Sequence, residues 1–173
     1  MTAHPSRPAA VTLALLAALA AGCSTTTTGK NGGTTSVDPS AAAADRARSY
    51  MRAVVADDWS TACSLMSAEQ RTACHERHPV AETPDPDGPA LGPVLLDRPP
   101  IRVPGTSVHP DGWGVIVSYT VAWPGKRTLT ERIALRMTDA AGEWWVDQRE
   151  DVADSDLTAP EDPALAALAR VVR

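Results

Sequence analysis

The chain has 173 residues, of which 43% are apolar, and its 16 basic and 21 acidic side chains leave a formal net charge of −5. Because nucleic acids and anionic lipid headgroups are themselves negative, this balance argues against both as partners. Beyond the first 37 residues, the length suffices for one domain with a single hydrophobic core.

A short apolar run near the start of the chain ends at a cysteine. Residues 9–21 are apolar or small apart from Thr12, and the basic side chain of Arg7 precedes them. This length is typical of the core of a signal peptide and falls short of the roughly 20 residues that a membrane-spanning helix needs. An ordinary secretory signal or an uncleaved buried helix would produce a similar run.

Residues 20–23, Ala-Ala-Gly-Cys, resemble the lipobox of bacterial lipoproteins, with Ala20 at the position where that motif usually has leucine. The resemblance implies a signal peptide over 1–22 and lipidation of Cys23, whose acyl chains would anchor the protein to the outer face of the cell membrane. The chain that follows is rich in Thr, Ser and Gly and predicts a flexible tether. We therefore expect the lipidated cysteine and its tether to occupy 23–37.

Three helices are expected to begin the folded domain, which we place over residues 38–150. Asp38 is an N-cap acceptor, and Pro39 follows it at the first helical position, where proline is preferred. Apolar residues then recur at helical spacing to about Ala56. The further expected helices run from Trp59 to Met66 and from a capping box at Ser67–Gln70 to His78.

Two cysteines remain beyond the tether, and the break between these helices decides whether they can pair. On one straight helix, Cys63 and Cys74 would lie about 16 Å apart, whereas a disulfide needs Cα atoms within about 7 Å. Helices folded back at Ser67 allow the bond, and an oxidising compartment favours it. The alternative is a zinc site that adds His75 and His78, although the adjacent Cys74 and His75 do not readily face one ion. We therefore predict a disulfide, and neither a metal nor another cofactor.

A long antiparallel hairpin is the clearest feature of the middle of the chain. Apolar residues alternate with small or polar ones over 113–123 and again over 128–137. Because a slip of one residue would turn every side chain to the wrong face, register follows the buried face. The apolar faces match only with an odd-length loop at 124–126, which pairs Val121 with Leu129.

A second turn over 139–142 is expected to add a third strand to this meander, with the helices on its apolar side. The apolar face then places Trp144 opposite Met137. On the other face, Trp145 would lie opposite Arg136 and form an exposed cation–π pair.

The segments around this meander are less regular. Residues 79–104 hold eight prolines and predict irregular chain with short edge strands. His109 is interpreted as an isolated loop residue. Residues 151–173 predict an acidic tail with a short helix at its end. Its first acidic residues lack the glycine and terminal glutamate that an EF-hand calcium loop requires; they are Asp151, Asp154 and Asp156.

These elements predict an α+β fold in which N-terminal helices pack on a three- to five-stranded antiparallel sheet. The segment 57–67 (Asp-Asp-Trp…Ala-Cys-Ser-Leu-Met-Ser) and the order of helices before a meander resemble small actinobacterial lipoproteins whose domain is similar to the nuclear transport factor 2-like superfamily. The resemblance covers residues 38–150 and implies a cone-like sheet around a pocket closed by the helices. That superfamily includes ketosteroid isomerases, dehydratases and non-catalytic binding proteins.

Tyr119 and Glu131 are the candidate pocket residues, because the expected register places them opposite each other on the apolar face. They would either form a solvated pair at the rim or line a pocket as ligand-orienting or proton-transfer groups. Two functions therefore remain open. One is an anchored module that binds a small apolar ligand or a membrane-surface protein, and the other is a small isomerase- or dehydratase-type enzyme that uses this pair.

Overall fold

The computed structural model describes residues 38–79 and 87–170 of the chain, which belong to one compact unit. The predicted signal peptide, Cys23 and the tether lie outside these residues. Within the described segments, no helix combines the length and hydrophobicity that crossing a membrane would require.

Three helices precede the sheet, as predicted. Helix α1 spans Pro39–Val55, and the carboxylate of Asp38 accepts a hydrogen bond from the Ser40 backbone N–H at 2.9 Å. Asp58 caps α2 (Trp59–Ser64) in the same way, and the chain turns back before α3 (Ala68–Arg77).

The capping box predicted at the start of α3 does not form. The hydroxyl of Ser67 makes no capping hydrogen bond, and its backbone N–H donates instead to the carbonyl of Val146 at 2.8 Å. The N–H that Gln70 was expected to bind is therefore already used by the sheet. The helix still begins at the predicted place, because the chain must turn there to reach the sheet.

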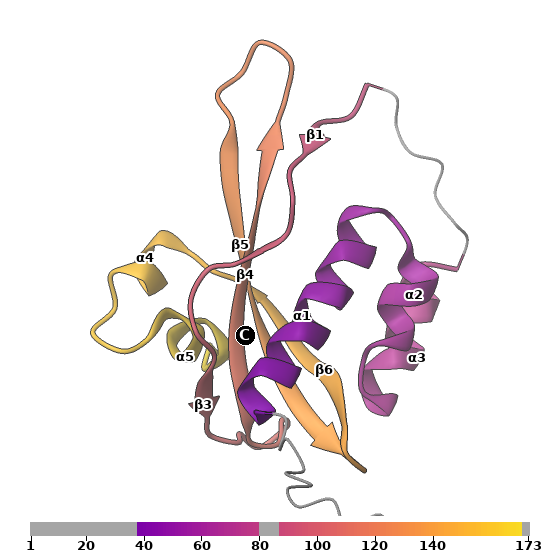
Figure 1. The fold of residues 1–173 in the computed structure, drawn as a ribbon, viewed down its shortest axis with the longest axis vertical. Coiled ribbons are helices and arrows are strands. Elements are labelled where there is room, and N and C mark those ends of the chain that lie inside the picture. The colour runs from indigo at the N-terminus through magenta and orange to yellow at the C-terminus, as the bar shows by residue number, and fades with distance from the viewer. Residues whose placement is uncertain (1–37, 80–86, 171–173) are drawn as a thin grey trace, which may run out of the picture. The chain divides into compact units, whose positions relative to one another are not determined.

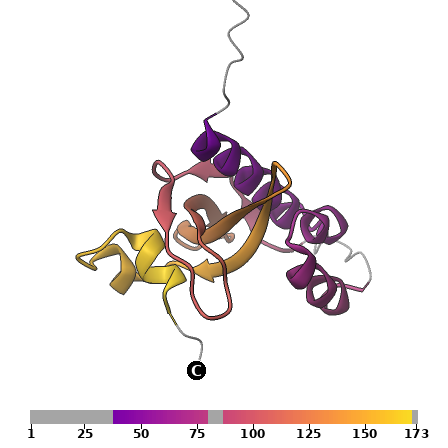
Figure 2. The same ribbon diagram turned by 90° about the horizontal axis from the view of Figure 1, so that it is seen from below.

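The sheet has six antiparallel strands and curls into a half-barrel (Figures 1 and 2). Its centre is formed by β4 (Gly112–Ala122) and β5 (Leu129–Ala140), and β6 (Glu143–Asp151) forms one edge. The other side of β4 pairs with three short strands from the proline-rich segment: β1 (Ala90–Leu91), β2 (Leu95–Leu96) and β3 (Ile101–Val103). The predicted α+β class and curled antiparallel sheet are confirmed, but the sheet has six strands where three to five were expected, because the proline-rich segment supplies three short ones.

The register of the β4–β5 hairpin is also the predicted one. Val121 pairs with Leu129, and Val115 pairs with Leu135. The turn lies at residues 124–126, where Gly125 has a φ of +71°, a conformation that glycine adopts at no steric cost. In Figure 1 this hairpin extends beyond the helices, and its turn lies at the opposite end from the start of α1.

The predicted register of the third strand is wrong. The second turn has only two residues, because Ala140 pairs with Glu143, so Met137 faces Val146 rather than Trp144. The residues of this turn both have positive φ, as type I′ hairpins require. Farther along β6 a bulge adds one residue, Asp147, and shifts the register again.

The expected exposed pair of Trp145 and Arg136 is wrong for the same reason. Arg136 pairs with Gln148 and is 1% exposed. Trp145 pairs with Thr138, and the guanidinium of Arg46 lies 4.9 Å from its ring centroid.

The sheet carries a hydrophobic core on each face, whereas the sequence predicted one. The first core lies between α1–α3 and one face, and includes Tyr50, Met51, Val117 and Leu135. The second lies under helix α5 (Pro163–Leu168), which follows the short helix α4 (Asp154–Leu157) and packs on the opposite face.

Small side chains on that opposite face allow α5 to approach. A Cβ added at Gly114 would stand only 3.2 Å from the Cβ of Ala164. The segment 151–170, set apart in the sequence as an acidic tail, therefore contributes buried residues to the same compact unit.

Candidate functional site

The predicted pair of Tyr119 and Glu131 is aligned as expected, and Tyr119 packs against the margin of the core between the helices and the sheet. The two residues are Cα partners, with Tyr119 half-buried and Glu131 exposed. Burial, and then the Glu131 carboxylate, raise the pKa of Tyr119 above its ordinary value.

A cavity of about 370 Å³ lies elsewhere, at the edge of β6. We call it the β6 cavity. Its walls come from α1, α2, α3, β6 and the loop between β3 and β4. Its lining residues are Tyr50, Trp59, Met66, Gln70, Cys74, Arg77, His78, His109, Asp147, Gln148, Arg149 and Glu150.

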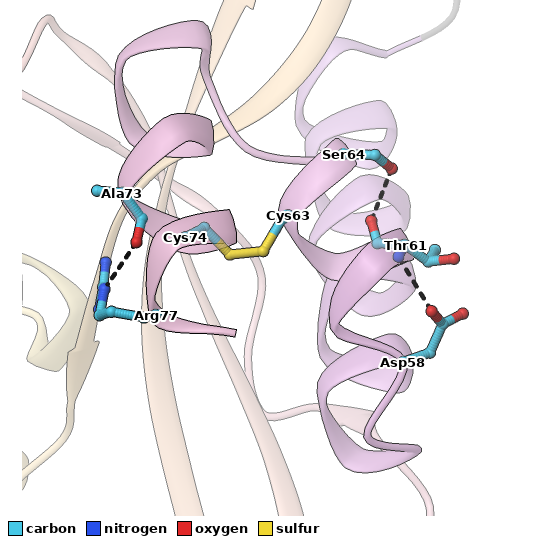
Figure 3. Close-up of a disulfide and its surroundings, with 7 residues drawn as sticks. All are labelled: Asp58, Thr61, Cys63, Ser64, Ala73, Cys74 and Arg77. Carbon is cyan, nitrogen blue, oxygen red and sulfur yellow. Dashed lines mark hydrogen bonds between the residues drawn. A yellow bond between two sulfur atoms is a disulfide. The ribbon is translucent and has the colours of Figure 1, made fainter. Parts of the chain in front are cut away.

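The disulfide predicted between Cys63 and Cys74 forms and builds one wall of this cavity. The two Cα atoms lie 5.5 Å apart, and the bond joins α2 to α3 (Figure 3). Cys63 is completely buried, and Cys74 also lines the cavity. The bond therefore holds together α2 and α3, which line the cavity across from β6.

The histidines near these cysteines do not assemble a metal site with them. His78 stacks on Trp59, with ring centroids 3.6 Å apart and planes 4° from parallel, whereas His75 is exposed on α3. Among residues 38–79 and 87–170, no group of three or more His, Cys, Asp or Glu side chains is placed to hold a metal ion.

The turn between α2 and α3 pairs with the edge of β6 at Val146. The N–H of Val146 donates to the carbonyl of Leu65 at 3.0 Å, and its carbonyl accepts from Ser67. The four residues that follow Val146 line the cavity. The bulge begins with the first of them, Asp147.

A buried carboxylate and a histidine meet at this bulge. Asp147 has a side chain that is 3% exposed, and its Oδ2 lies 2.7 Å from Nδ1 of His109. Bulges interrupt the alternation of a strand and redirect a side chain, which is how an edge residue comes to lie buried here. The contact of Asp147 with Nδ1 orients the imidazole and leaves Nε2 as the nitrogen that can bind or accept a proton.

The loop that carries His109 is held in place by a buried arginine. Nη1 of Arg136 donates to the carbonyls of Pro104 and Pro110, at 2.6 and 3.1 Å. Its Nε donates to the side chain of Gln148 at 3.0 Å. Burial lowers the pKa of Arg136, and the charge of Asp147 opposes that shift. Arg136 thus holds both ends of the loop, at Pro104 and Pro110, and lies close to the carboxylate of Asp147.

Tyr50 lies near two arginines, Arg77 and Arg149, which supply positive charge to one part of the β6 cavity. Burial raises the pKa of the Tyr50 phenol, and the nearby charges of Arg149 and Arg77 oppose that rise. The hydroxyl therefore lies within the field of both guanidinium groups, which come from β6 and from the end of α3. Such an arrangement can hydrogen-bond and neutralise an anionic group.

Sequence reasoning missed the residues of this site. It interpreted His109 as an isolated loop residue and gave Asp147 no role. Their contact spans 38 positions of the chain. The one available signal was that Asp147 continues the strand directly from the apolar residues 144–146.

Comparison of the chain with protein-family models, with curated proteins and with solved structures finds no match. The function is therefore argued from the β6 cavity and the sequence alone.

Proposed function

We propose that the protein is a lipid-anchored lipoprotein on the outer face of the cell membrane, whose domain binds a small ligand in the β6 cavity. The lipobox-like residues before Cys23 support the anchor. The Cys63–Cys74 bond supports an oxidising, extracytoplasmic compartment. The helices-first order and the curled sheet support the relationship to the nuclear transport factor 2-like superfamily.

The observation that carries the binding function is the contact of the buried Asp147 carboxylate with the half-buried His109 beside the cavity. Burying a carboxylate costs free energy. A residue on an edge strand could avoid this cost by exposing its side chain to water. Here the carboxylate fixes an imidazole at a cavity of a size typical of small-molecule sites, in the range of about 300–1,000 Å³. Fixed polar groups of this kind orient a ligand.

Intact mass of the protein, extracted gently from its own membranes, tests the proposal. Denatured protein should begin at Cys23, carry acyl chains there and lack two hydrogens at the disulfide. Native protein should carry additional mass that denaturation removes. The additional mass should be lost from Asp147→Asn and His109→Gln and retained by Glu131→Gln, the matched control on the exposed hairpin.

Two results would contradict this function. An unacylated chain would refute the anchor. Acylated protein without additional native mass would refute the small ligand and would direct the search to protein partners at the membrane surface.

A second candidate function, an isomerase- or dehydratase-type enzyme, is favoured by the same contact. Nε2 of a histidine held by a carboxylate is a suitable proton acceptor, and it lies at a cavity, unlike the exposed Glu131. Incubating the complex in deuterated water distinguishes the candidates. An enzyme should introduce carbon-bound deuterium into the bound molecule and lose that ability in His109→Gln, whereas a binding protein should release the molecule unlabelled.

A further inference from the structure

Within the described residues, neither of the two arginines that line the β6 cavity is paired with a buried carboxylate. Arg77 donates from Nε to the carbonyl of Ala73 at 3.1 Å, and within the described part of the chain it has no carboxylate partner. Arg149 lies 3.6 Å from Asp151, whose side chain is 81% exposed. Exposed ion pairs of this kind contribute little, because water screens them.

The two carboxylates that line the cavity are engaged by other groups. Asp147 contacts His109, and Glu150 accepts a hydrogen bond from the side-chain amide of Gln148 at 3.2 Å. Neither is paired with Arg77 or Arg149 among the described salt bridges. Both guanidinium groups are solvent-exposed and are therefore accessible to a ligand that enters the cavity.

An unsatisfied polar atom lies in the same place. Nδ1 of His78 is buried and has no hydrogen-bond partner within residues 38–79 and 87–170, although the ring lines the cavity and stacks on Trp59. Buried polar atoms are nearly always hydrogen-bonded, so this nitrogen is open to a partner that the described residues do not supply, such as a water molecule or a ligand.

Apolar and aromatic side chains form part of the remaining wall, beside the polar side chain of Gln70. Trp59, Met66 and the disulfide sulfur of Cys74 come from the helical side, opposite the charged residues of β6. A molecule that fills the cavity can therefore place a charged end against Arg77 and Arg149 and an apolar body against Trp59 and Met66.

We propose that the ligand of the β6 cavity carries an oxyanion, a carboxylate or a phosphate, bound by Arg77, Arg149 and the hydroxyl of Tyr50. Its apolar or aromatic body lies against Trp59 and Met66. Guanidinium groups bind carboxylates and phosphates alike through paired hydrogen bonds, so the same site suits either oxyanion. This assignment rests on the proposed binding function and specifies the class of ligand.

Calorimetric titration of the purified, disulfide-bonded protein with four probes tests the assignment. Benzoate and phenyl phosphate each join an aromatic body to an oxyanion, benzamide is the neutral counterpart of benzoate, and inorganic phosphate lacks the body. Benzoate or phenyl phosphate should bind at least tenfold more tightly than benzamide, about 1.4 kcal/mol. The stronger of the two identifies the oxyanion, and inorganic phosphate binding as tightly as phenyl phosphate would remove the apolar body from the proposal.

Arginine variants locate the binding. Arg77→Gln and Arg149→Gln should each weaken the bound probe about tenfold, and Tyr50→Phe should weaken it less. Arg127→Gln removes the same charge from the exposed hairpin turn and should change nothing.

Failure of this assignment is distinguishable from failure of the binding function. Equal affinity for benzamide and benzoate would refute the oxyanion assignment, and so would unchanged affinity in both Arg77→Gln and Arg149→Gln. In either case, a ligand that co-purifies with the protein would still support the binding function. No binding of any probe, together with no co-purifying mass, overturns both.

Discussion

Removing the disulfide should destabilise the domain by an amount that follows from the length of its loop. The bond joins residues 11 positions apart. On the chain-entropy model, closing so short a loop lowers the entropy of the unfolded chain enough to stabilise the fold by about 3 kcal/mol at 25 °C. For a domain of this size, roughly 4 °C in Tm corresponds to each kcal/mol, which predicts a fall of about 12 °C.

Thermal and urea unfolding, followed by circular dichroism, should measure this loss. The variant that combines Cys63→Ala with Cys74→Ala is compared with the oxidised protein and with the protein in reductant. Alanine is the suitable replacement because Cys63 is completely buried and Cys74 nearly so, and a serine hydroxyl would lack a partner there. Reductant should lower the Tm of the oxidised protein and leave that of the double variant unchanged.

A small effect would refute the reasoning. If the double variant loses less than about 1 kcal/mol, the unfolded chain already holds these residues close together, and loop closure is not what the bond contributes. If it loses much more than the reduced protein does, the missing sulfur atoms matter through packing rather than through the cross-link.

Three further predictions concern the core, the tyrosines and the loop that carries His109. Leu135→Ala should cost about 2–5 kcal/mol in urea unfolding because Leu135 is fully buried, while Leu95→Ala, at a side chain 58% exposed, should stay within about 0.5 kcal/mol. Tyr50 and Tyr119, the two tyrosines of the chain, both have pKa values raised above 10.0, so tyrosinate absorbance should appear only at higher pH. Since the folded state holds these protons more tightly, the associated stability is complete below pH 10 and is lost as pH rises through the raised values, and Tyr50→Phe should flatten that loss. Arg136→Met should lower stability by about 2–4 kcal/mol and accelerate amide exchange at His109, because two loop carbonyls lose their donor; an unchanged exchange rate would show that the loop holds itself.

Elements with local signals were predicted well. Helix α1 begins at Asp38 and Pro39 because an N-cap and a proline act within one turn of the helix. The β4–β5 register follows from the period-two alternation, since a slip of one residue would expose the whole apolar face. The disulfide followed from the helix break at Ser67, which brings Cys63 and Cys74 together.

Elements that depend on exact residue counts between strands were not predicted. A two-residue turn and a four-residue turn are both compatible with the sequence around Gly142, and they differ by two places in the register of β6. The bulge at Asp147 has no local signature, because it arises from how the strand meets its neighbours. The second core, under α5, was missed since Ile116 and Ala134 alternate with the residues of the first core and seemed to form a solvent face.

The sequence by itself determined the order of helices and strands, the central hairpin and the pairing of Cys63 with Cys74, because each depends on residues close together in the chain. Only the tertiary structure placed His109 beside Asp147 and gathered Arg77, Arg149 and Tyr50 around one cavity. Those contacts join a loop, an edge strand and two helices. Their existence depends on the bulge and on the buried Arg136, which act between segments and leave no period or spacing in the sequence.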